Sequence, residues 1–170
     1  MESPTPPPET ATTRLARIWA DKMPITVPLG VRIEALDRAS LAVSMPMAPN
    51  LNHTGTVFGG SLSALATLTG WSAVWVLLEE AGVLVDLVIQ DATIRYTHPA
   101  RTDVVARVKW PGPNEVGPLL RTLAKRGRAR TGVAVTIHDA AGEQVAEFEG
   151  RYVAQEREVR SEKREVRSEK

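Results

Sequence analysis

The most constraining feature of the sequence is an uncharged stretch of twenty residues, Gly59 to Leu78. Its length alone would allow it to cross a membrane as a helix. Eight of its residues, however, are Gly, Ser or Thr, and no Lys or Arg stands close on either side. Glu79 and Glu80 follow it, and Gly82 supplies a helix stop. The sequence therefore predicts a helix buried on most sides in a globular domain, and no membrane segment.

The segments on either side of this helix have the patterns of strands. Asp86 to Thr97 is the clearest, because Ala92, Ile94 and Tyr96 alternate with polar residues. Further strands are expected over Gly30 to Leu36, Ser40 to Met47, Asp103 to Trp110, Ala129 to His138 and Gln144 to Val153. Strands and helices do not alternate strictly, so a doubly wound sheet is not expected. The pattern predicts an α+β fold in which one antiparallel sheet wraps around the long apolar helix.

Two shorter helical segments are also indicated. Apolar residues at helical spacing predict a helix over Thr13 to Met23, capped by Thr12 or Thr13 and ended by Pro24. Three Leu between residues 119 and 123 predict a single helical turn.

The chain is expected to form one domain, with a segment at each end of the chain that lies outside this domain. Residues 1–12 hold four Pro among Ser, Thr and Glu, which predicts a disordered leader. Residues 155–170 contain the segment REVRSEK twice, with one Val in each copy. One apolar residue in seven is too few for a coiled-coil seam, so this charged tail is also expected to be disordered. Residues 13–154 then make the folded domain.

Composition excludes several classes of function. Lys and Arg number 21 and Asp and Glu number 20, a balance that does not suit a globally basic nucleic-acid binder. The absence of Cys excludes disulfides, thiolate metal sites and cysteine nucleophiles, and three His make an imidazole-rich metal site improbable. We therefore expect no metal and no cofactor. The beginning of the sequence has no basic and apolar signal region, which predicts a cytoplasmic protein.

The segment from Asn52 to Leu62 carries the chemistry that the sequence indicates. The first turn of a helix has free N–H groups and a partial positive charge. Gly59 and Gly60 leave this turn open to a ligand oxygen, because neither has a Cβ. Such a place can polarise a carbonyl or hold an anion, and the Asn52 amide can donate a second hydrogen bond. The alternative is that the two glycines only permit a tight entry and close packing.

This segment resembles the motif of the hotdog-fold thioesterases, N-x-x-G-x-x-H-G-G followed by a helix. Asn52, Gly55, Phe58, Gly59 and Gly60 stand in the motif positions. The form N-H-x-G-T-x-F-G-G-S-L is most similar to a thioesterase branch otherwise found C-terminal to a GNAT acetyltransferase. The resemblance covers roughly residues 14–154. It implies a hotdog fold, a homodimer or a dimer of dimers, and an acyl-CoA or acyl-carrier-protein thioester as substrate.

The resemblance also implies roles for single residues. The Gly60 N–H, with that of Gly59, would bind the thioester oxygen, and Asn52 would position the thioester or a water. Relatives carry Asp or Glu seven residues after the second Gly, where this sequence has Thr67. Thr67 cannot act as a carboxylate nucleophile or a strong base, although its hydroxyl can orient a water. The histidine of the motif is replaced by Phe58.

Other residues are candidates for the missing base or for contacts with substrate. Asp91 is the best carboxylate candidate; the alternative is that it pairs with Arg95 or lines a dimer interface. His53 titrates near neutral pH and adjoins the motif, although it can equally be a solvated loop residue. Ser63 lies one turn before Thr67 on the same helix face, where packing is the alternative.

Basic residues gather between positions 121 and 130. The cluster consists of Arg121, Lys125, Arg126, Arg128 and Arg130. Arg126 and Arg128 are candidates for binding the phosphates of coenzyme A, because the guanidinium fork matches phosphate oxygens. The alternative is a solvated face. No aromatic residues interleave, so no nucleic acid is expected.

Together these features predict a cofactor-free acyl thioester hydrolase. Two alternatives remain open. One is a non-catalytic acyl-CoA-binding module, which Thr67 and Phe58 favour. The other is an enoyl-thioester hydratase or dehydratase, which would need His53 and an acidic partner facing one substrate.

Overall fold

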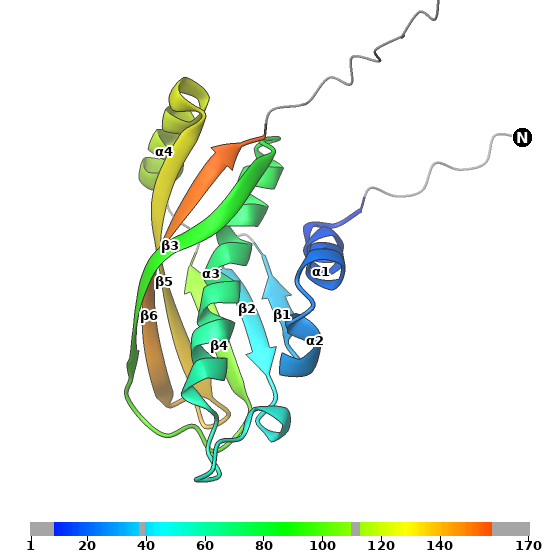
Figure 1. The fold of residues 1–170 in the computed structure, drawn as a ribbon, viewed down its shortest axis with the longest axis vertical. Coiled ribbons are helices and arrows are strands. Elements are labelled where there is room, and N and C mark those ends of the chain that lie inside the picture. The colour runs from blue at the N-terminus through cyan, green and yellow to red at the C-terminus, as the bar shows by residue number, and fades with distance from the viewer. Residues whose placement is uncertain (1–8, 38–39, 110–112, 158–170) are drawn as a thin grey trace, which may run out of the picture.

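The computed structural model describes residues 9–37, 40–109 and 113–157 (Figure 1). Residues 1–8 of the expected leader and 158–170 of the expected tail lie outside the described residues. The elements follow one another as α1 (Ala11–Lys22), α2 (Thr26–Leu29), β1 (Arg32–Leu36), β2 (Ser40–Met45), a 3-10 turn (Ala48–Asn50), α3 (Gly59–Glu80), β3 (Val85–Tyr96), β4 (Val104–Lys109), α4 (Pro113–Arg126), β5 (Arg128–Asp139) and β6 (Gln144–Glu156).

The strands form one antiparallel sheet of six, in the order β1-β2-β4-β5-β6-β3. The sheet curves around α3, with α1 and α2 on the β1 side and α4 at the end where α3 terminates (Figure 1). This arrangement confirms the predicted α+β fold of an antiparallel sheet around one long helix. β3 forms an edge of the sheet, and its described pairing is with β6 alone.

α3 is the long apolar helix that the uncharged stretch predicts. It is long and apolar enough to cross a membrane, but 61% of its most apolar window is buried inside the protein. Gly70 lets the sheet approach closely, because an added Cβ would overlap the Tyr152 hydroxyl oxygen and lie 3.0 Å from Cζ. That hydroxyl donates to the Thr67 carbonyl at 2.8 Å. Burial raises the pKa of Tyr152, so the phenol keeps its proton and remains a donor.

α1 covers one flank of α3 and is held there by two polar contacts. Trp19 is buried, and its Nε1 donates to the buried Ser72 Oγ at 3.0 Å. Arg14 meets both oxygens of Glu79, with Nε 2.7 Å from Oε1 and Nη2 2.8 Å from Oε2. The ion pair ties α1 to the C-terminal end of α3.

The ends of the domain differ from the prediction by two residues on each side. α1 begins at Ala11, inside the expected leader, because the Thr10 side chain accepts from the Thr13 N–H at 3.2 Å. The cap is therefore Thr10, and neither Thr12 nor Thr13. β6 continues to Glu156, inside the expected tail, because it pairs with β3 as far as Val85.

α4 is a helix of 14 residues where the sequence predicted a single turn. Pro118 stands inside it and removes one backbone hydrogen bond. Helix propensity alone therefore did not predict this helix. Leu119 and Leu123 are buried in one apolar cluster with Val74 of α3, Ala129 of β5 and Tyr152 of β6. Tertiary packing therefore outweighs the local preference.

Candidate functional site

The loop before α3 is organised by the side chain of Asn52. Its Oδ1 accepts from the Thr54 N–H (2.9 Å), the Thr54 hydroxyl (2.8 Å) and the Thr56 N–H (3.1 Å). Its Nδ2 donates to Thr56 Oγ1 at 2.8 Å. An amide nitrogen has two hydrogens, so one of them remains for a substrate or a water. The sequence pointed to a binding role for Asn52 and did not reveal this structural one.

Phe58 leads from the loop into α3. Its N–H donates to the Asn50 carbonyl at 2.7 Å, and its carbonyl accepts the first bond of the helix from the Leu62 N–H at 3.1 Å. The N–H groups of residues 59–61 precede that bond and have no acceptor within the helix. They form the positive end of the α3 dipole. The sequence predicts that this turn polarises a carbonyl or holds an anion, and this stays a prediction.

Two aromatic rings enclose the glycines at this end of α3. A Cβ on Gly60 would overlap the Phe58 ring, and a Cβ on Gly59 would lie 3.3 Å from Tyr96 Cζ. The Tyr96 hydroxyl, at the end of β3, donates to the Gly59 carbonyl at 2.9 Å. A side chain at Gly60 would displace the Phe58 ring and one at Gly59 would press on Tyr96, and Gly60 remains exposed. The two glycines can therefore permit close packing and also leave room for a ligand.

The structure brings Ser63 and Thr67 onto the helix face that carries Gly60. Spacings of three and four residues place the three positions above one another on a helix, and both side chains are partly exposed. The same stripe continues with Trp71 and Trp75, whose rings stack with centroids 6.1 Å apart. One helix face thus holds the free N–H groups, two hydroxyls and an aromatic surface.

Asp91 lies on the opposite face of the sheet. In β3, Ile94 packs into the core and Tyr96 reaches α3, so the alternation turns Asp91 outward. Its carboxylate is 3.4 Å from Arg151 and 57% exposed. Arg95 pairs with Glu147 instead of Asp91. The geometry therefore does not support Asp91 as the base at Gly60, because the sheet separates them.

Arg126 ends α4 and Arg128 begins β5, and α4 lies at the end of the molecule where α3 terminates (Figure 1). They line a hollow of about 880 Å³ with Arg157 and with the carboxylates of Asp86 and Glu156. A helix of 22 residues is about 33 Å long at 1.5 Å per residue. Within one chain, the two arginines are therefore about a helix length away from the exposed N–H groups.

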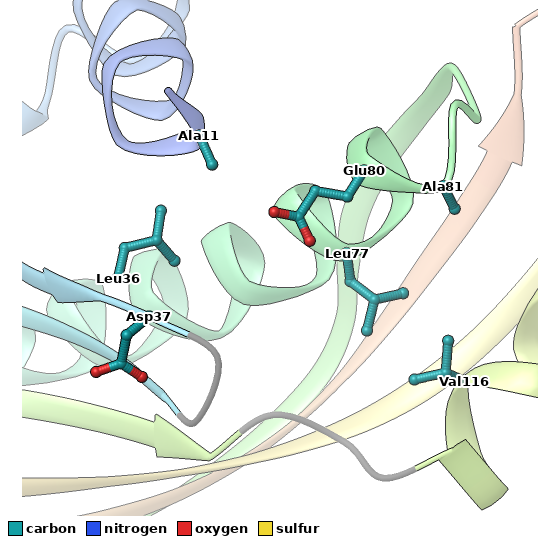
Figure 2. A pocket seen from close by; sticks show the side chains of 7 residues that line it. All are labelled: Ala11, Leu36, Asp37, Leu77, Glu80, Ala81 and Val116. Atoms are coloured by element: carbon teal, nitrogen blue, oxygen red, sulfur yellow. The ribbon is translucent and has the colours of Figure 1, made fainter. Parts of the chain in front are cut away.

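A second hollow, of about 590 Å³, also lies near the C-terminal end of α3 (Figure 2). It is lined by Ala11, Leu36, Asp37, Leu77, Glu80, Ala81 and Val116. Its charged lining residues, Asp37 and Glu80, are both acidic, and the helix dipole is negative at this end. Phosphates and a developing oxyanion would be repelled there, so this hollow does not fit the predicted chemistry.

His53 is exposed on the loop. No group of three His, Cys, Asp or Glu within the described residues is arranged to hold a metal ion. Sequence reasoning missed the contact of Tyr96 with the Gly59 carbonyl. Its signal was a phenol at the last inward position of the alternating strand.

Comparison with known proteins points to one family. Residues 12–156 match the model of a family described as "Putative thioesterase (yiiD_Cterm)". A structure named "putative thioesterase" from Shewanella oneidensis is 32% identical with a TM-score of 0.75, over 85% of this chain and 97% of that one. A "probable thioesterase" from Pseudomonas aeruginosa is 26% identical with a TM-score of 0.71, over 85% and 96%. A protein of unknown function from Chlorobaculum tepidum, 24% identical over 86% and 94%, shares the fold with a TM-score of 0.83.

Proposed function

The chain belongs to the thioesterase family that matches residues 12–156 and has the hotdog fold, and we propose that it hydrolyses acyl thioesters of coenzyme A or of an acyl carrier protein. The observation that carries this proposal is the exposed Gly60 at the positive end of a 22-residue helix. Its N–H can bind the thioester oxygen and stabilise the negative charge that develops there during attack. The reaction needs no cofactor, and the cytoplasm supplies both classes of substrate.

In the proposed reaction, a water first loses a proton to solvent, its oxygen then bonds to the thioester carbon, and the carbonyl electron pair moves onto oxygen. The N–H of Gly60, with that of Gly59, donates to this oxyanion. The C–S bond then breaks, and the thiolate takes a proton from solvent. Ser63 and Thr67 lie on the same helix face, where their hydroxyls orient the water. The remaining Asn52 N–H positions the thioester from the loop.

We further propose a homodimer in which β3 pairs with β3 of a second copy. The described edge of β3 is long and open, and such edges need cover. Large exposed apolar side chains lie on this strand or beside its ends, namely Phe58, Leu84, Val88 and Tyr96. A monomer in light scattering at micromolar concentration would contradict this arrangement.

This pairing would bring the basic hollow to the substrate. Antiparallel strands run in opposite directions, so the Val85 end of one β3 would lie beside the Tyr96 end of the other. Arg126 and Arg128 of one subunit would then approach the α3 entry of its partner. We assign them to the phosphates of a coenzyme A whose thioester lies in the other subunit.

A thiol-release screen across acyl-CoA chain lengths tests the proposal. Release of free thiol at a rate proportional to protein concentration is the expected result. Binding of acyl-CoA without release would identify an acyl-CoA-binding module, which Thr67 and Phe58 favour on chemical grounds. Hydration of an enoyl-CoA without thiol release would identify a hydratase.

A further inference from the structure

We propose that Tyr96 is a positioning residue for thioester hydrolysis, because its hydroxyl orients and polarises the peptide that binds the thioester oxygen. The inference rests on the proposed function. It concerns a residue at the end of β3, outside the loop motif and outside the stripe of side chains on α3.

The argument begins with the peptide unit. The carbonyl of Gly59 and the N–H of Gly60 belong to the same planar amide, joined by a bond of partial double-bond character. Tyr96 donates to that carbonyl at 2.9 Å. A hydrogen bond at the oxygen draws electron density toward it and makes the N–H of the same amide a stronger donor. The bond also limits rotation of the peptide plane, so the N–H keeps its direction.

Close packing holds the phenol in this position. A Cβ on Gly59 would lie 3.3 Å from Tyr96 Cζ and 3.4 Å from the hydroxyl oxygen, which is tight for any side chain. The backbone of Tyr96 is paired with Ala146 of β6. The side chain itself is 49% exposed, so filling the core does not explain it. Its polar end is directed at the first turn of α3.

The chain supplies a matched control in its second tyrosine. The sequence has two Tyr, and both donate from the sheet to a carbonyl of α3. Tyr152 reaches the Thr67 carbonyl at 2.8 Å, in the interior of the helix. Tyr96→Phe and Tyr152→Phe therefore each remove one O–H to carbonyl bond between the sheet and α3, from β3 in the first case and from β6 in the second. Only Tyr96→Phe removes it from the peptide that carries the Gly60 N–H.

The expected kinetic effect is moderate. Losing a whole oxyanion donor costs about 10²- to 10³-fold in kcat. A neighbouring bond strengthens a hydrogen bond by roughly 10–30%, which corresponds to about a 2- to 8-fold change in kcat. Tyr96→Phe should therefore lower kcat by this factor and leave KM within about twofold. Tyr152→Phe should lower the melting temperature and retain kcat.

A second measurement does not depend on turnover. The amide proton of Gly60, observed by ¹H–¹⁵N NMR, should move upfield in Tyr96→Phe, because the carbonyl of its peptide loses a donor. The same signal should stay in place in Tyr152→Phe. Should Tyr96→Phe not fold, 3-fluorotyrosine in the Tyr152→Phe protein labels Tyr96 alone, and its more acidic phenol should move the Gly60 signal downfield.

The outcomes separate the inference from the proposed function. A wild-type protein that releases no thiol refutes the proposed hydrolase activity. The chemical shift of the Gly60 amide proton in Tyr96→Phe still decides whether Tyr96 polarises the peptide. An active wild type with unchanged kcat and an unmoved Gly60 signal in Tyr96→Phe overturns the inference alone. Equal losses of kcat in both Phe variants would show that Tyr96 acts only as a tie between sheet and helix.

Discussion

Replacing Gly70 by Ala should destabilise the fold through one identifiable collision. The added Cβ would overlap the hydroxyl oxygen of Tyr152 and lie 3.0 Å from Cζ. Tyr152 is fully buried, and its hydroxyl is bonded to the Thr67 carbonyl, so the ring cannot move away without losing that bond. Overpacking costs about 1–3 kcal/mol and the lost bond about 1 kcal/mol, while Ala in a helix gains about 1 kcal/mol over Gly. The net loss is about 2 kcal/mol, or about 6 °C in melting temperature.

Thermal and chemical denaturation measure this loss, with Gly132→Ala as the control. Gly132 lies in β5 with nothing within 4 Å of an added Cβ, so Ala there should leave the stability unchanged or raise it slightly. Combining Gly70→Ala with Tyr152→Phe removes the hydroxyl from the collision, and the pair should cost less than the sum of the single changes. Wild-type stability in Gly70→Ala, or equal damage from Gly132→Ala, would refute the reasoning.

Three further predictions concern the site. Asn52→Ala removes four hydrogen bonds from the loop. It should lower turnover by on the order of 10²-fold and also lower the melting temperature. A change in turnover alone would mean that these hydrogen bonds do not stabilise the loop. Asp91→Asn should leave thiol release within about twofold, because the carboxylate faces outward beside Arg151; abolished release in a folded protein would place the base on β3. Arg126→Ala with Arg128→Ala should weaken CoA thioesters more than short thioesters without the nucleotide. This difference should shrink with salt, which screens exposed charges within about 10 Å at 0.1 M; equal losses on both substrates would make the cluster structural.

The main architecture could be predicted because its signals are local. A charge-free stretch can be stable only where it is buried, and this identified α3 from the sequence alone. Alternation of apolar and polar residues likewise identified β3 within one residue at each end. Both patterns reflect burial, which can be recognised from the order of apolar and polar residues along the sequence.

Features that depend on contacts between distant residues were not predicted. α4 forms in spite of Pro118 because its leucines are buried in an apolar cluster with residues of α3 and of the sheet. The bonds of Asn52 depend on the path of the whole loop. The placement of Asp91, by contrast, follows from the alternation itself. If the apolar side of β3 faces the helix, its polar side must face away from the α3 entry.

In the proposed site, the residues on the helix face at Gly60 include no carboxylate and no imidazole that could act as a base. Thr67 stands where relatives have a carboxylate, and its hydroxyl does not accept a proton near neutral pH. Hydroxide should then be the attacking species, so kcat should rise about tenfold per unit between about pH 6 and pH 9. Thr67→Asp should make kcat independent of pH in this range, because a carboxylate is ionised from about pH 4 upward. A wild-type profile that levels off within this range and loses its plateau in His53→Gln would contradict this conclusion and make His53 the base.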